Sequence, residues 1–145
     1  MGKIVASVAA TAAILLAACR TAPAVGGAGA PSATGAVQEF LAAAHAGDMR
    51  AMASLFGTSN GPIASRDDAN TVEKRMRALQ CYLTHDSAQV VDDRPGSSGP
   101  GRQLEVELRQ RNLVRRTTFG AVPGPHGRWY VESFDIAKVT DLCHP

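Results

Sequence analysis

The sequence predicts an α+β domain in which helices come first and an antiparallel sheet follows. In the first half of the chain, apolar residues repeat at the spacing of helices, and after His85 the repeat changes from about 3.6 to about 2 residues. Segments rich in Gly, Pro and Ser separate the alternating stretches, which favours short hairpin turns. Together these observations indicate N-terminal helices packed on an antiparallel sheet of about four strands.

Three helices are predicted from apolar side chains spaced three and four residues apart. The first begins near Gly35 and ends at Gly47, and Asp48 is suited to cap the second. Ser65 followed by Asp68 resembles a capping box at the start of the third helix. The three apolar stripes consist of Val37, Phe40, Leu41 and Ala44; of Met49, Met52, Ala53 and Phe56; and of Val72, Met76, Leu79 and Leu83.

Four strands are predicted at 88–93, 104–109, 113–122 and 128–136. The second is the clearest, because apolar and charged residues alternate along it and give one buried and one solvated face. Its apolar residues are Leu104, Val106 and Leu108, and its charged residues are Glu105, Glu107 and Arg109. In the last strand, alternation predicts Trp129, Val131 and Ser133 on one face and Tyr130, Phe134 and Ile136 on the other.

The N-terminus has the order of a secretory signal. Lys3 precedes a mainly apolar run, Ile4–Ala18, which is too short to cross a bilayer core of about 30 Å comfortably. The run ends in Leu16-Ala17-Ala18-Cys19, which resembles the lipobox of bacterial lipoproteins. The resemblance implies a diacylglycerol on the Cys19 sulfur and cleavage before Cys19. An ordinary secreted protein with a chance cysteine is the alternative.

The expected organisation is a signal peptide at 1–18, the lipidated Cys19 with an Ala/Gly/Pro-rich tether at 19–34, and one domain at 35–145. A flexible tether of this length spans roughly 20 Å, so the domain is expected to stay near the membrane that holds the lipid. Arg20 after the cysteine resembles the pattern of lipoproteins that move to the outer membrane. We therefore expect a cell-envelope location, facing the periplasm from the outer membrane in a Gram-negative cell.

The other two cysteines, Cys81 and Cys143, are expected to form a disulfide, because an exported chain folds in an oxidising compartment. Closing so long a loop would contribute roughly 4 kcal/mol. Two free thiols or a redox pair is the alternative, although the sequence has no C-x-x-C spacing to support redox work.

Two stretches resemble the nuclear transport factor 2-like superfamily over about residues 36–140. The first is VQEFLAAAHAGD at 37–48 with Met52 and Leu55-Phe56-Gly57 after it, and the second is GRWYV at 127–131. The resemblance implies a cone-shaped domain in which a curved sheet wraps around helices. The superfamily includes isomerases, dehydratases and many non-catalytic binding modules, so the resemblance says little about function.

Isomerase-like members place a carboxylate base and a hydrogen-bond donor inside the cone. None of the carboxylates and tyrosines here matches a family motif, so we expect no catalytic residue and no enzyme activity. The candidates considered are Asp67, Asp68, Asp86, Asp135, Tyr82 and Tyr130.

Metal ligands and cofactors are not expected either, since the histidines lack the spacing of a metal motif. These are His45, His85, His126 and His144. A cluster of arginines near one hairpin is expected to form a cross-strand charge ladder with Glu105 and Glu107, with a lipid-phosphate or polyanion contact as the alternative. These are Arg109, Arg111, Arg115 and Arg116.

Nucleic acid is excluded as a partner mainly by the expected envelope location, and composition adds to this. The chain has 15 Lys and Arg against 13 Asp and Glu, and only 5% aromatic residues, which argues against binding nucleic acid. The expected function is a non-catalytic binding or accessory module for a small apolar ligand or an envelope protein. The alternatives are an isomerase- or dehydratase-like enzyme with a carboxylate inside the cone, and a structural protein whose core is filled by residues such as Met52, Met76, Phe119 and Phe134. The oligomeric state is left open.

Overall fold

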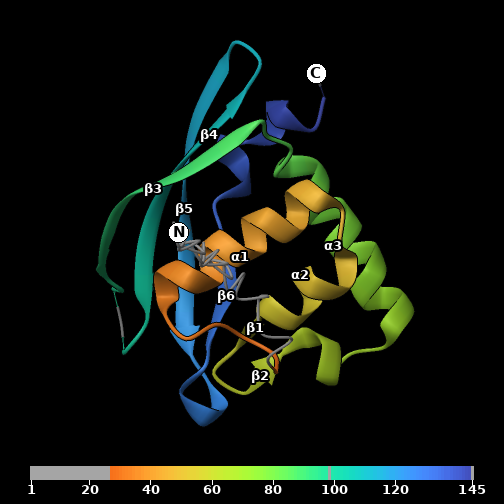
Figure 1. Ribbon diagram of the computed structural model, residues 1–145, viewed down its shortest axis with the longest axis vertical. Coiled ribbons are helices and arrows are strands. Elements are labelled where there is room, and N and C mark those ends of the chain that lie inside the picture. The colour runs from red at the N-terminus through yellow and green to blue at the C-terminus, as the bar shows by residue number, and fades with distance from the viewer. Residues whose placement is uncertain (1–26, 98, 145) are drawn as a thin grey trace, which may run out of the picture.

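The computed structural model describes residues 27–97 and 99–144, which form the predicted α+β arrangement (Figure 1). Its helices are α1 (Ala33–Ala46), α2 (Met49–Leu55) and α3 (Ala69–Tyr82). Its strands are β1 (Gly57–Thr58), β2 (Gly61–Pro62), β3 (Ser87–Pro95), β4 (Arg102–Gln110), β5 (Leu113–Pro123) and β6 (Trp129–Phe134). The predicted signal peptide and Cys19 lie outside the described residues. Within those residues, no helix combines the length and the apolar character needed to span a bilayer.

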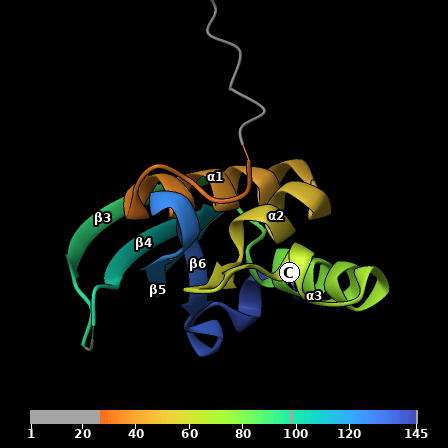
Figure 2. The ribbon, with the colours of Figure 1, turned by 90° about the horizontal axis from the view of Figure 1, so that it is seen from below.

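The main sheet is an antiparallel meander with the strand order β3-β4-β5-β6, and β1 and β2 form a separate two-stranded sheet. Figure 2 shows α1 lying on one face of this curved sheet, with α2 and α3 beside it. We call the face toward α1 the inner face and the opposite one the outer face. α1 contacts all four strands of the main sheet, so it forms the second layer of the domain.

The first helix starts earlier than the sequence suggested, at Ala33 rather than near Gly35. Ser32 is its N-cap and accepts a hydrogen bond from the Gly35 N–H at 3.0 Å. Gly47 ends the helix in the left-handed conformation, with a φ of 69°, as predicted for a C-terminal glycine.

The segment just before α1, residues 28–32, is packed on the domain, and we call it the strap. Ala30 is fully buried, and its N–H donates to the Trp129 carbonyl at 2.9 Å. The Trp129 N–H donates back to the Ala30 carbonyl at 2.8 Å. The sequence predicts a flexible tether here, whereas in the structure Ala30 forms a single antiparallel bridge with Trp129 at the edge of β6.

The capping box predicted at Ser65 is wrong. Ser65 ends a 3-10 helix, Ile63–Ser65, and its hydroxyl donates to the Pro62 carbonyl at 3.0 Å. Asp68 is the N-cap of α3 and accepts from the backbone of both Asn70 and Thr71 at 3.1 Å. The Asp68 carboxylate therefore satisfies two of the backbone donors in the first turn of α3 by itself.

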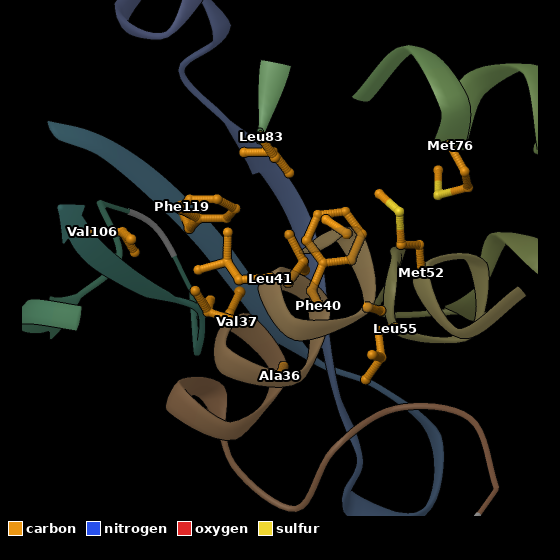
Figure 3. Close-up of a cluster of buried hydrophobic side chains, with 14 of the residues drawn as sticks. Ala36, Val37, Phe40, Leu41, Met52, Leu55, Met76, Leu83, Val106 and Phe119 are labelled. Atoms are coloured by element: carbon orange, nitrogen blue, oxygen red, sulfur yellow. The ribbon is translucent and has the colours of Figure 1, made fainter. Parts of the chain in front are cut away.

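Strand β4 alternates as predicted, and its apolar residues form one wall of the core. Leu104, Val106 and Leu108 are fully buried. They face a cluster of side chains from the helices and from β5, which Figure 3 draws at close range. Fully buried members of this cluster include Phe40, Met52, Met76 and Phe119, and Phe134 packs against it with its ring stacked on Phe119.

The alternation predicted for the last strand is wrong, because a bulge interrupts it. Gly120 pairs with Ser133 and Ala121 pairs with Val131, so Glu132 is an extra residue in β6. Tyr130 and Val131 are both buried, although they are neighbours in sequence, because the Tyr130 ring packs against Gly29 and Gly124. The strand also ends at Phe134, and Ile136 begins a 3-10 helix.

Cys81 and Cys143 lie at disulfide-bonding distance, with a Cα–Cα separation of 4.7 Å. The bridge joins the last turn of α3 to the C-terminal 3-10 helix Thr140–Leu142. Leu142 and Val139 are 1% and 0% exposed. The bridge thus holds an apolar C-terminal segment against the core.

Candidate functional site

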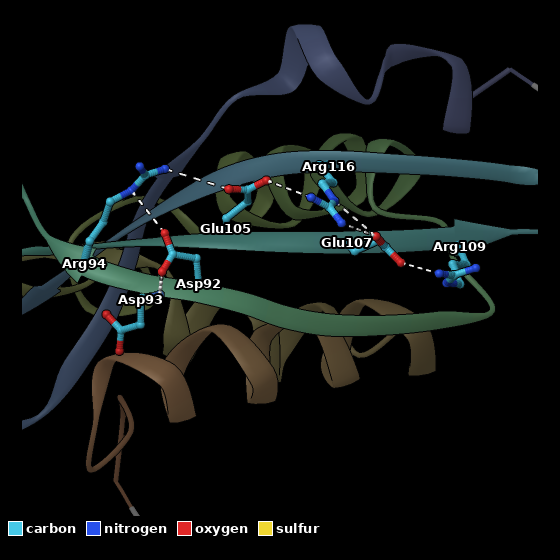
Figure 4. A network of polar contacts seen from close by, with 7 residues as sticks. All are labelled: Asp92, Asp93, Arg94, Glu105, Glu107, Arg109 and Arg116. Carbon is cyan, nitrogen blue, oxygen red and sulfur yellow. Dashed lines mark hydrogen bonds and ion pairs between the residues drawn. The ribbon is translucent and has the colours of Figure 1, made fainter.

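The outer face of the sheet carries a network of charged side chains, in which Glu107 contacts two arginines (Figure 4). Arg116 on β5 donates to Glu107 Oε2 through Nε at 3.1 Å and Nη2 at 3.0 Å. Arg109 donates to Glu107 Oε1 at 2.5 Å. Only 9% of Glu107 is exposed, because the two guanidinium groups cover it.

The same network runs along the face toward β3. Arg116 lies 3.8 Å from Glu105 Oε1, and Arg94 lies 3.9 Å from Glu105 Oε2. Arg94 also lies 3.7 Å from Asp92. Three carboxylates therefore meet three guanidinium groups, and their charges cancel. This is the cross-strand ladder expected from the sequence, and it offers little net charge to a polyanion.

The electrostatic consequence is greatest at Glu107. The hydrogen bonds from Arg116 and then from Arg109 lower the pKa of the Glu107 carboxyl below its ordinary value, against the opposing effect of burial. Asp141 behaves similarly, because its hydrogen bonds from Arg115 lower the pKa of that carboxyl.

The arginines grouped in the sequence do not form one cluster. Arg109 and Arg116 share the outer face, whereas Arg115 is directed to Asp141 near the C-terminus. Arg111 occupies the β4–β5 turn with a φ of 51°, and its N–H donates to Asp86 at 2.6 Å. The hairpin thus spreads its guanidinium groups over different surfaces.

The carboxylates considered for catalysis all have local roles at the surface. Asp68 caps α3, and Asp86 fixes the β4–β5 turn. Asp67 lies 3.4 Å from Arg75, and Asp135 lies 3.5 Å from Lys138. The structure therefore does not bring these four residues together.

The two tyrosines also lie apart. Tyr82 is partly buried and packs against the core at the end of α3. Tyr130 is 3% exposed, and its hydroxyl donates to the Ala28 carbonyl at 3.3 Å. Arg128 adds a hydrogen bond to the Gly29 carbonyl at 2.5 Å. Tyr130 and Arg128 thus hold the strap in place.

The hollows at the surface of the described residues include the following three. The first, of about 640 Å³, lies between α2 and α3 and is lined by residues such as Met49, Ala53 and Val72. The second, of about 380 Å³, lies between α1 and the start of β3. The third, of about 540 Å³, lies beside Gly27 and the turns near Gly61 and Pro125.

None of these three hollows is lined by the centre of the described core. The centre of the core consists of side chains that are 0% exposed to solvent and line none of these hollows: Phe40, Met52, Met76 and Phe119. The space between α1 and the sheet is therefore filled by the protein's own side chains (Figure 3).

The second hollow contains a feature that the sequence did not reveal. His45 from the last turn of α1 and His85 from the loop before β3 both line it, with ring centres 5.2 Å apart. His45 Nδ1 lies 3.0 Å from the His85 carbonyl oxygen, and His85 Nδ1 lies 2.6 Å from the Leu83 carbonyl oxygen. No short sequence motif could have joined residues so far apart in the chain.

The remaining histidines are elsewhere. His126 lies in the β5–β6 turn with a φ of 59°, and His144 follows the disulfide at the C-terminus. Within residues 27–97 and 99–144, no group of three or more His, Cys, Asp or Glu side chains is placed to hold a metal ion.

Comparison with models of protein families, with curated proteins and with solved structures gives no match for this chain.

Proposed function

We propose that this protein is a bacterial envelope lipoprotein, held at a membrane by a lipid on Cys19, whose domain is a non-catalytic accessory module. The observation that carries the proposal is the sequence Leu16-Ala17-Ala18-Cys19 at the end of an apolar run. In a Gram-negative cell, Arg20 favours the outer membrane, with the domain facing the periplasm.

The strap supports a short connection between lipid and domain. Ala28 and Gly29 are tied to the domain through Tyr130 and Arg128. Only residues 20–26 separate Cys19 from the first described residue, and a chain of that length reaches at most about 28 Å. A partner would therefore meet this domain close to the membrane surface.

For the fold, we propose membership of the nuclear transport factor 2-like superfamily. Support comes from a curved sheet packed on α1, from α1 ending at Gly47, and from a Gly turn before Trp129. These features lie at the positions on which the sequence resemblance rests.

The filled core favours a module that binds a partner at its surface rather than a ligand in its interior. An apolar ligand inside the cone would need the space that Phe40, Met52, Met76 and Phe119 fill. We therefore favour docking of an envelope protein over storage of an apolar ligand. A purely structural role at the envelope is the second candidate, favoured by the same filled core.

Lipid attachment is tested by labelling cells with a palmitate analogue and separating membrane from soluble fractions. Wild-type protein should carry the label and remain with the membrane. Cys19→Ser should lose the label and leave the membrane, while the matched variant Ser7→Ala should behave as wild type. Retention of label in Cys19→Ser would refute the anchor.

The accessory role is tested by crosslinking in intact cells from a photoreactive residue at Arg50, beside the first hollow, or at Val114 on the outer face. A discrete crosslinked envelope protein at either position supports docking. Absence of a crosslink at both positions supports the structural role instead.

A further inference from the structure

We propose that His45 and His85 bind one divalent transition-metal ion, a property that goes beyond the accessory role proposed above. The site combines one side chain from the end of α1 with one from the loop that leads into β3. The two imidazole rings line the same surface hollow, which leaves room for water or an external ligand to complete the coordination of the ion.

The hydrogen bonds fix which nitrogen of each ring is available. A carbonyl oxygen can only accept, so the ring nitrogen beside it must donate. His45 Nδ1 is therefore protonated and donates to the His85 carbonyl. His85 Nδ1 is likewise protonated and donates to the Leu83 carbonyl. In the neutral ring this leaves Nε2 with a free lone pair, which is the form that binds metals.

The same bonds are the outer-shell contacts that metal-binding histidines use. Such a histidine almost always donates its second ring N–H to a carbonyl or carboxylate, which sets both its tautomer and its orientation. Here both Nδ1 atoms are turned toward the backbone of residues 83–85. Both Nε2 atoms consequently point away from that backbone.

The separation of the rings suits a shared ion. With metal–nitrogen distances of about 2.0–2.1 Å and a tetrahedral angle, the centres of two coordinated imidazoles lie about 5 Å apart. The observed separation is 5.2 Å, with the ring planes inclined at 40°. The distance between the ring centres thus matches that of two imidazoles bound to one ion.

The ligand chemistry selects the class of metal. Two imidazole nitrogens suit Zn²⁺, Cu²⁺ and Ni²⁺, whereas Mg²⁺ and Ca²⁺ prefer oxygen ligands. His85 is 8% exposed, which holds one ligand rigidly, while the exposed His45 can adjust to the ion. With only two protein ligands, the site is expected to bind more weakly than a structural zinc site.

The test is titration of the full-length chain, purified in detergent with its disulfide intact, with Zn²⁺ and with Cu²⁺. Calorimetry should give one ion per chain, and pulsed electron paramagnetic resonance of the Cu²⁺ form should show two imidazole ligands. His45→Gln should weaken the affinity about tenfold or more, since even loss of an outer-shell partner costs 10–100-fold. His126→Gln is the matched control and should bind as wild type does.

His45→Gln removes an exposed side chain, so it keeps the test valid even if the buried His85→Gln variant fails to fold. Long-range proton–nitrogen NMR spectra provide a second measurement. In the metal-free protein, both His45 and His85 should show the Nδ1–H tautomer. The proposal is overturned if wild type shows no saturable one-to-one binding, if His45→Gln binds equally well, or if the Cu²⁺ spectrum shows a single imidazole.

Discussion

The two faces of the main sheet differ in polarity, since the inner face is apolar and buried and the outer face is charged. Val106 points to the inner face, where it is fully buried against the core. Glu107, the next residue, points to the outer face, where Arg109 and Arg116 hold its carboxylate. The strand is the same, and only the alternation of side chains separates an apolar interior from a charged surface.

The difference teaches where the stability of the domain resides. Burying one large apolar side chain contributes about 1.5–3 kcal/mol, whereas exposed ion pairs contribute much less because water screens them. The inner face therefore supplies most of the free energy that stabilises the fold.

The largest effect is expected from emptying the inner face. Phe40→Ala should lower the free energy of unfolding by about 3–5 kcal/mol, because it leaves a cavity among residues that cannot collapse into it. Val114→Ala, on the exposed outer face, is the control and should cost less than about 0.5 kcal/mol. Urea denaturation of both variants measures the contrast, which is refuted if the two costs are equal.

The second largest loss of stability is expected from removing the Cys81–Cys143 disulfide. The double variant Cys81→Ser/Cys143→Ser should lose about 2–5 kcal/mol, because the bridge closes a long loop and holds Leu142 against the core. Reducing agent should destabilise wild type by a similar amount and leave the double variant unaffected. A reducing agent that shifts both unfolding curves equally would contradict this role.

The same change placed on each face gives the sharpest comparison. Val106→Thr should cost about 1–3 kcal/mol, because it buries a hydroxyl among apolar side chains. Val114→Thr should change stability by less than about 0.5 kcal/mol, because Val114 is 43% exposed. Thermal unfolding measures both, and a more costly Val114→Thr would reverse our assignment of the faces.

The smallest effect concerns acid and the outer face. The folded-state pKa of Glu107 lies below its ordinary value of 4.5, so the unfolded chain takes up a proton first as the pH falls. The stabilisation from this carboxylate is therefore complete above that value and is lost as the pH falls through the lowered pKa. Glu107→Gln should show a shallower loss of stability below about pH 4.5 in acid titrations. A decline as steep as that of wild type would contradict the assignment.

Much of the fold could be predicted because its signals are local. The alternation in β4, Gly47 at the end of α1 and Asp48 at the start of α2 each depend on a few adjacent residues. The errors arose where a distant partner intervened. Glu132 forms a bulge only because of how β6 pairs with β5, and Ala30 is buried only because β6 offers it an edge.

The candidate sites divide in the same way. The ladder around Glu107 could be predicted, since facing charges on a hairpin follow from alternation. The pair of His45 and His85 could not, because a helix end and a loop meet only after the domain has folded. Each of these histidines is oriented by a backbone carbonyl, and side-chain spacing in a sequence carries no trace of such a partner.

The claim that the domain is closed by its own side chains, and so acts through its surface, is tested most directly by native mass spectrometry. The full-length chain, extracted from membranes and treated with a chelator, would be weighed under native and denaturing conditions. We predict the same mass per chain in both states, reduced by two hydrogens through the Cys81–Cys143 bridge. An organic molecule that accompanies the native chain and is lost on denaturation would contradict the claim.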